Sequence, residues 1–237
     1  MTYMRHFHDQ LQLLLQKVVM MGDLAEGMIQ LAVQALVKRN EALVSVVHGK
    51  EHQVNLLQVE VDDLAVKLTA LQQPVARDAR FLFMASRIGG ELERIGDQAI
   101  NICQNAHLVL AAPPLKAEMP SAGLVDIPIM AEVAQKMVRD SLTAMMNKDV
   151  DLANRVLEED ERVDAFRDQV FRSLLTYIMA DPGTIQRALS LILIARNLER
   201  IGDHATNIGE EVIYWIQGRD VRHGKGLAKS REGQDRP

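Results

Sequence analysis

ERIGDQAINI occupies residues 93–102, and ERIGDHATNI occupies residues 199–208. Eight of the ten positions are identical, although the second stretch begins 106 residues after the first in a chain of 237 residues. The surrounding sequence has diverged much further, because residues 28–55 and 137–164 share only five identical positions. A repeat of this period predicts two copies of one folding unit. The retained stretch is where we look for function.

Apolar residues recur every three or four positions along nearly the whole chain, and no segment alternates convincingly with a period of two. This pattern predicts helices, which turn residues and prolines separate. The expected helices cover residues 8–38, 41–72, 75–110, 126–147, 150–180 and 183–217. Because short connections force neighbouring helices to run antiparallel, the sequence predicts an all-α fold of two tandem three-helix bundles.

Prolines at positions 113, 114, 120 and 128 mark the connection between the two copies. We therefore expect a first bundle over residues 1–112 and a second over residues 121–218. Residues 219–237 are mostly polar and have little to bury, so we expect a disordered tail there.

Composition narrows the class of protein. A hydrophobic content of 48% with 25% charged residues is typical of a folded protein, and the net charge of −5 argues against nucleic acid as a partner. A single cysteine, Cys103, rules out an internal disulfide framework and suits a reducing compartment. Neither a secretory signal nor an apolar run long enough to span a bilayer is recognisable. We expect a cytoplasmic protein.

Paired carboxylate or amide side chains stand four residues apart on two neighbouring helices of each copy. On a helical projection at about 100° per residue, those of the retained stretch lie opposite its apolar side. Those of the preceding helix flank the edge of its apolar side, where they can face the neighbouring helix. The eight residues are Glu51, Asn55, Glu93 and Asp97 in the first copy and Asp160, Asp164, Glu199 and Asp203 in the second.

Two interpretations of these residues compete: a solvated acidic face, or a cation site built from oxygen ligands. Oxygen ligands suit hard cations such as iron(III), manganese, magnesium or calcium. A solvated face has no reason to retain its residues, together with Gly96 and Gly202, while its surroundings change. We therefore favour metal binding. We expect tighter binding in the second copy, which has four formal negative charges against three.

Signatures of enzymes are missing from the sequence. It contains no Glu-x-x-His pair of the di-iron type, no HExxH, no phosphate-binding P-loop and no GxSxG. His204 stands beside Asp203, but its counterpart in the first copy is Gln98, and we interpret it as an exposed helix histidine. We expect no catalysis.

Two three-helix repeats that each end in Glu-Arg-Ile-Gly-Asp resemble the PhoU family, the accessory and regulatory proteins of bacterial phosphate-specific transport. The resemblance runs from about Phe7 to Gln217. It implies an all-α cytoplasmic protein, often a homodimer, that binds metal clusters of iron, zinc, manganese or magnesium through E(D)xxxD motifs. These motifs fall on the eight residues named above, with Asn55 in place of an expected carboxylate.

The resemblance also implies a role and partners. Members look like negative regulators of the phosphate-starvation response that couple the ATP-binding subunit of the phosphate transporter to a phosphate-sensing histidine kinase. Association with the membrane is then peripheral and runs only through these partners.

Two alternatives stay open. One is a metal-dependent hydrolase or metal-storage protein that uses the same carboxylates. The other is a scaffold whose acidic faces bind basic partner surfaces without metal.

Overall fold

The computed structural model describes residues 2–72, 74–111 and 122–221, and within them it contains long α-helices, one short 3₁₀ helix and no strand. The expected all-α fold is confirmed. The proline-rich connection at 113–120 and the tail beyond residue 221 lie outside the described residues. The elements are α1 (Thr2–Val37), α2 (Ala42–Gln72), α3 (Ala76–Ala111), α4 (Ala122–Asn147), α5 (Val150–Ala180), η1 (Pro182–Thr184) and α6 (Ile185–Gln217).

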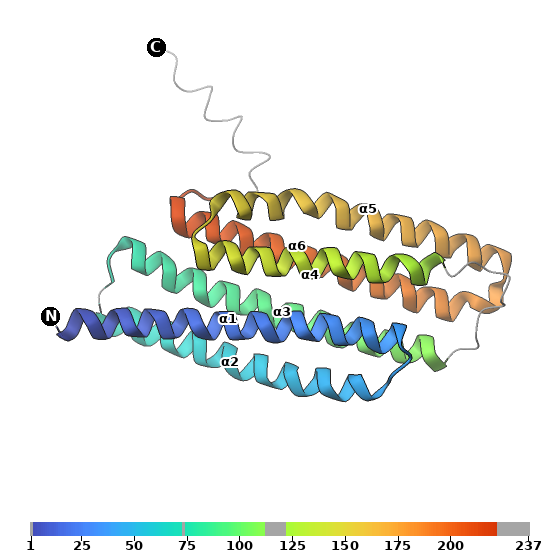
Figure 1. Cartoon of the computed structure of the whole chain (residues 1–237), viewed down its shortest axis with the longest axis horizontal. Coiled ribbons are helices and arrows are strands. Elements are labelled where there is room, and N and C mark those ends of the chain that lie inside the picture. Colours follow the sequence, from blue (N-terminus) through green and yellow to red (C-terminus); the bar gives the residue numbers. More distant parts are fainter. Residues whose placement is uncertain (1, 73, 112–121, 222–237) are drawn as a thin grey trace, which may run out of the picture.

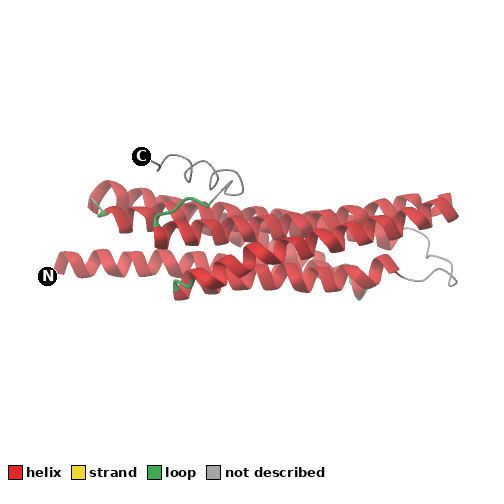
Figure 2. Cartoon of the chain, turned by 90° about the horizontal axis from the view of Figure 1, so that it is seen from above, coloured by secondary structure: helices red, strands yellow, loops and turns green. Residues whose placement is uncertain are grey.

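The two copies lie side by side as elongated bundles with their long axes roughly parallel (Figure 1). Helices α1, α2 and α3 pack on one another, as do α4, α5 and α6. The two bundles meet where α3 packs against α6 and α1 packs against α4. Every helix runs along the length of the molecule when it is seen from above (Figure 2). Each contact between the bundles thus joins a helix to its own counterpart in the other copy.

The core is almost wholly aliphatic, and it follows the apolar side of each retained stretch. Cys103 belongs to it, and burial raises the pKa of its thiol to about 11, which keeps the sulfur protonated and unreactive. The side chains on the apolar side of the two stretches have no exposed surface at all. They are Leu92, Ile95, Ala99, Ile102, Leu198, Ile201, Ala205 and Ile208.

The turn between the first and second helices has the same geometry in both bundles. Arg39 and Lys148 both have left-handed backbones, with φ of 51° and 55°, and each stands just after its helix ends. The next residue, Asn40 or Asp149, accepts a hydrogen bond from a backbone N–H of the following helix at 3.1 or 2.9 Å. A left-handed residue followed by a side-chain cap satisfies backbone groups at both helix ends. The duplication therefore extends to turn geometry.

Helix boundaries differ from the expected ones at three points. Helix α1 begins at Thr2, and α4 begins at Ala122 and includes Pro128. Pro128 lies near the start of α4 between buried Ile127 and Met130, so packing holds this turn helical although proline cannot donate a hydrogen bond. A 3₁₀ turn precedes α6, because Asp181 accepts a hydrogen bond from the Gly183 N–H at 3.0 Å.

A close approach of α1 and α4 joins the middle of the two bundles. A Cβ atom at Gly22 would overlap the buried side chain of Leu142 on α4. One turn further along, Glu26 accepts a hydrogen bond from Arg139 Nε at 3.0 Å, and its backbone carbonyl accepts one from Gln135 Nε2 at 3.1 Å. Gly22 therefore sets the spacing at which these polar contacts form.

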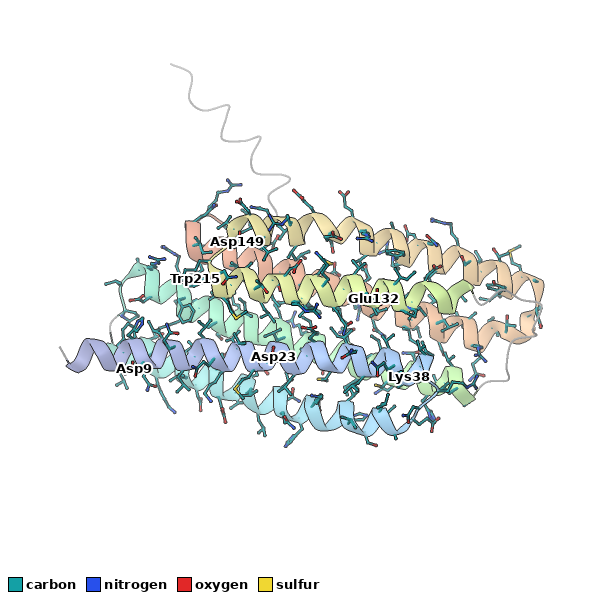
Figure 3. The ribbon with its side chains drawn as sticks, in the orientation of Figure 1. Asp9, Asp23, Lys38, Glu132, Asp149 and Trp215 are labelled. Atoms are coloured by element: carbon teal, nitrogen blue, oxygen red, sulfur yellow. The ribbon has the colours of Figure 1, made fainter. Side chains whose placement is uncertain are left out.

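Aromatic packing joins the two bundles near one end of the molecule. The ring of Trp215 on α6 lies 5.1 Å from that of Phe81 on α3, and the Lys148 ammonium lies 5.5 Å from the centre of the Trp215 ring. Figure 3 places Trp215 beside Asp149, in the turn between α4 and α5. In the part of the chain that is described, no helix contains an apolar stretch long enough to cross a bilayer.

Replacing Gly22 with leucine should destabilise the fold, because the new side chain must displace Leu142. We expect the free energy of unfolding to fall by about 1–3 kcal/mol, as for other overpacked cores. Gly49 on α2 is the matched control, since a Cβ there meets nothing within 4 Å. Gly49→Leu should leave the stability unchanged or raise it by up to about 1 kcal/mol through helix propensity. Urea denaturation measures both, and a Gly22→Leu variant as stable as Gly49→Leu would contradict the packing argument.

Candidate functional site

The first copy brings Glu51 and Asn55 of α2 against Glu93 and Asp97 of α3. Partial burial raises the pKa of Asp97, and the charge of Glu51 raises it further. Burial and then the charge of Asp97 raise the pKa of Glu93, to which Glu51 also contributes. The Asn55 amide donates a hydrogen bond to the Glu51 carboxylate, while its own Oδ1 is buried and has no hydrogen-bond partner. Three carboxylates therefore lie close together, beside an amide whose oxygen has no hydrogen-bond partner.

The second copy brings its four predicted residues together in the same way. Arg167 Nη1 lies 2.7 Å from Glu199 Oε1 on α6 and 3.0 Å from Asp164 Oδ1 on its own helix, α5. Burial, followed by the negative charges of Glu199, Asp160 and Asp164, raises the pKa of Asp203 to about 6. The convergence expected from helix geometry is present in both copies.

The glycine of the second retained stretch lies against one of these carboxylates. A Cβ atom at Gly202 would lie 3.6 Å from Asp160 Oδ1 and 3.5 Å from Val163 Cγ1. These are ordinary van der Waals distances, so alanine would fit there and cover the carboxylate oxygen. Gly96 in the first copy instead faces the side chain of Met28, 3.4 Å from where its Cβ would be. Position 202 therefore lies within van der Waals contact of the Asp160 carboxylate.

The donor set fits a hard cation in chemistry, but its side chains are not arranged around one. Within the residues described, no group of three or more His, Cys, Asp or Glu side chains is placed to hold a metal ion. In the second copy Arg167 forms ion pairs with Asp164 and Glu199, and in the first copy the Asn55 amide donates a hydrogen bond to Glu51. Burial and the neighbouring carboxylates raise the pKa of Asp203, so its negative charge lacks a full counter-charge, while the buried Asn55 Oδ1 is a neutral acceptor without a donor. Metal binding through these eight residues stays a prediction, and it requires side chains to change rotamer.

Sequence reasoning missed Arg167. A signal was available, because Arg167 follows Asp164 by three residues on a helix, which is the spacing of an ion pair. Its positive charge offsets part of the second copy's extra negative charge. The tighter cation binding expected in the second copy also stays a prediction. Because of Arg167, we now expect the difference in affinity between the copies to be smaller.

The interpretation of His204 as an exposed helix histidine is wrong. Its side chain is only 14% exposed, and its Nδ1 lies 2.7 Å from Glu91 Oε2 on α3. Asn207 donates to the same Glu91 oxygen at 3.0 Å. Hydrogen bonds with His204 and Asn207 outweigh the burial of Glu91 and lower its pKa. The contact joins the two copies, and the helical projection of one copy could not reveal that the other copy covers this face.

These observations define a class of protein: a duplicated three-helix body that carries one carboxylate cluster on each copy. The model of the PhoU domain matches this chain twice, at residues 18–106 and 127–212. The chain therefore belongs to the PhoU family.

Relatives and solved structures agree with this assignment. The phosphate-specific transport system accessory protein PhoU homolog of Pseudomonas putida is 37% identical, over 92% of this chain and 84% of its own length. The protein of the same description from Aquifex aeolicus is 37% identical, over 88% of this chain and 91% of its own. The crystal structure of PhoU from Pseudomonas aeruginosa matches with a TM-score of 0.83 at 36% identity and covers 90% of this chain and 100% of that one.

Removing the charge of Asp203 should stabilise the metal-free protein above pH 6. The ordinary pKa of 3.8 applies to the unfolded chain and about 6 to the folded one, so the folded state binds the proton more tightly. Stability is therefore gained as the pH falls through 6 and lost as it rises. We expect Asp203→Asn to be more stable than the wild type at pH 8 by about 1 kcal/mol, a figure reduced for solvent screening of an exposed carboxylate.

Urea denaturation at pH 8 and pH 4, with a chelator present, measures this difference. The advantage of the variant should shrink toward zero at pH 4, where the wild-type carboxylate is protonated. A variant that is less stable than the wild type at pH 8 would contradict repulsion within the cluster.

Proposed function

We propose that this chain is a non-catalytic accessory protein of phosphate-specific transport that restrains the phosphate-starvation response. Membership of the PhoU family is the observation that carries the proposal. The names of the relatives from Pseudomonas putida and Aquifex aeolicus support the link to phosphate transport, since both are described as accessory proteins of that system.

The chain would act as a cytoplasmic adaptor between the ATP-binding subunit of the phosphate transporter and a phosphate-sensing histidine kinase. A long body with two similar halves offers separate surfaces to two partners. Large apolar side chains on the outside of the second copy, among them Phe171 and Leu189 at 48% and 49% exposure, are suited to such contacts. Membrane association would be peripheral and depend on the partners, and the chain would act as a homodimer.

Metal ions would support this role by holding adjacent helices together. Iron, zinc, manganese or magnesium bound by Glu51, Asn55, Glu93 and Asp97 would join α2 to α3. The same ions bound by Asp160, Asp164, Glu199 and Asp203 would join α5 to α6. A bound cation supplies the positive charge that the clustered carboxylates lack, which removes their mutual repulsion. In the second copy it would displace Arg167 from Asp164 and Glu199.

Removing two carboxylates of the second copy should lower metal content. We expect Glu199→Ala/Asp203→Ala to bind about half the manganese of the wild type, because the first copy keeps its ligands. Elemental analysis after dialysis against Mn²⁺ measures the content per chain. Asp23→Ala/Glu132→Ala is the control, since both residues are exposed acids outside the clusters and are labelled in Figure 3. Equal metal content in the two double variants would refute binding through this cluster.

Deleting the gene should release the starvation response from control by phosphate. In phosphate-rich medium we expect a phosphate-starvation reporter to be high in the deletion strain and low again when the wild-type chain is restored. A reporter that stays low in the deletion strain would contradict the proposed restraint. The strain expressing Glu199→Ala/Asp203→Ala shows in addition whether the metal cluster takes part in the restraint.

A further inference from the structure

We propose that the second copy contains a binding site for a phosphate group, in the cleft between α5 and α6 beside its carboxylate cluster. The cleft has a volume of about 560 Å³. Arg167, Arg196 and Arg200 line it together with Glu199 and Asp203. The inference deepens the proposed function, on whose cation site it rests, by naming a second ligand for the same place.

Two of these arginines have their charge available. Arg196 and Arg200 stand one helical turn apart on α6, are exposed, and form no ion pair with any residue that the structure describes. Arg167 differs, because Asp164, Asp168 and Glu199 all contact it. A guanidinium group donates paired N–H groups in the geometry of phosphate oxygens. Two unpaired guanidinium groups in one cleft are a suitable anion-binding pair.

Charge balance makes the site depend on a cation. The cleft is lined by three arginines and by the carboxylates Asp168, Glu199 and Asp203, so its formal charges cancel. The charges of Asp160 and Asp164 also act on Asp203, and these additional carboxylates repel an anion. A divalent cation on the carboxylates cancels this excess of negative charge and offers its own positive charge to the phosphate oxygens. By linkage, phosphate must then strengthen cation binding as much as the cation strengthens phosphate binding.

The first copy lacks this arrangement. Gly90 stands at the position that corresponds to Arg196, and Gln58 corresponds to Arg167, so that only Arg94 matches its counterpart, Arg200. The two copies thus share three of the four acidic positions but only one of the three arginines. The second copy has therefore combined a cation site with an anion site, and the first copy serves as an internal control.

The cleft has room for more than a phosphate ion. Phe171 and Ile192 also line it, and 48% of the surface of Phe171 is exposed. An exposed aromatic ring next to phosphate-binding arginines can stack on a nucleobase. The phosphate group can thus come from inorganic phosphate or from a nucleotide, and the experiment must include both.

Equilibrium dialysis of the full chain with radiolabelled inorganic phosphate or ADP tests the site, with Mn²⁺ or with a chelator. We expect at least one of the two ligands to bind when Mn²⁺ is present and not in the chelator. Arg196→Gln/Arg200→Gln should weaken that binding by at least about tenfold, because each arginine contributes charged hydrogen bonds. The double variant should still bind Mn²⁺ without phosphate, and Arg94→Gln in the first copy should bind the ligand like the wild type.

Three results would overturn the inference: neither ligand binds in Mn²⁺, binding is equal in the wild type and the double variant, or binding persists in the chelator. The reporter experiment separates this inference from the proposed function. A chain that restrains the reporter but fails the dialysis test leaves the proposed function standing. Arginine-dependent binding by a chain that does not restrain the reporter supports the site and removes the proposed role.

Discussion

The structure depends on one constraint, which is that α3 and α6 must each bury an apolar side and present carboxylates on the other. Ile95 and Ile201 have no exposed surface, while Asp97 and Asp203 on the same helices stay exposed. The 3.6-residue period of the helix fixes both properties at once. The neighbours α2 and α5 then have to place their own polar edges against those carboxylates. Burial of aliphatic side chains thus provides the free energy that holds like charges together.

The two copies relieve the repulsion among these charges differently. In the first copy an amide, Asn55, replaces one carboxylate and donates a hydrogen bond to Glu51. In the second copy all four positions are acidic, and Arg167 adds a positive charge between α5 and α6. Both solutions are incomplete, because Asn55 Oδ1 stays unsatisfied and the pKa of Asp203 is raised. A shared backbone therefore carries two clusters of different formal charge.

Sequence alone predicted what depends on a single helix or on the repeat. The period of apolar residues revealed the helices, and the retained stretch revealed which carboxylates converge. It did not reveal contacts between the copies, since the burial of His204 by Glu91 depends on how α6 meets α3. It also did not reveal the start of α4, because Pro128 interrupts the expected pattern while packing keeps the turn helical. The ion pair of Arg167 with Asp164 could have been predicted from the sequence, because the two residues are three positions apart on one helix.

Pairing of each helix with its own counterpart gives the interface between the bundles the form of a twofold dimer within one chain. Such an interface forms at an effective concentration set by the tether, whatever the amount of protein in the cell. Positions related by the twofold axis can then change independently of each other. In a true homodimer they cannot, because both subunits have the same sequence. Glu91 pairs with His204, while the corresponding positions hold buried Asn197 and Gln98. Two copies within one chain can therefore specialise separately.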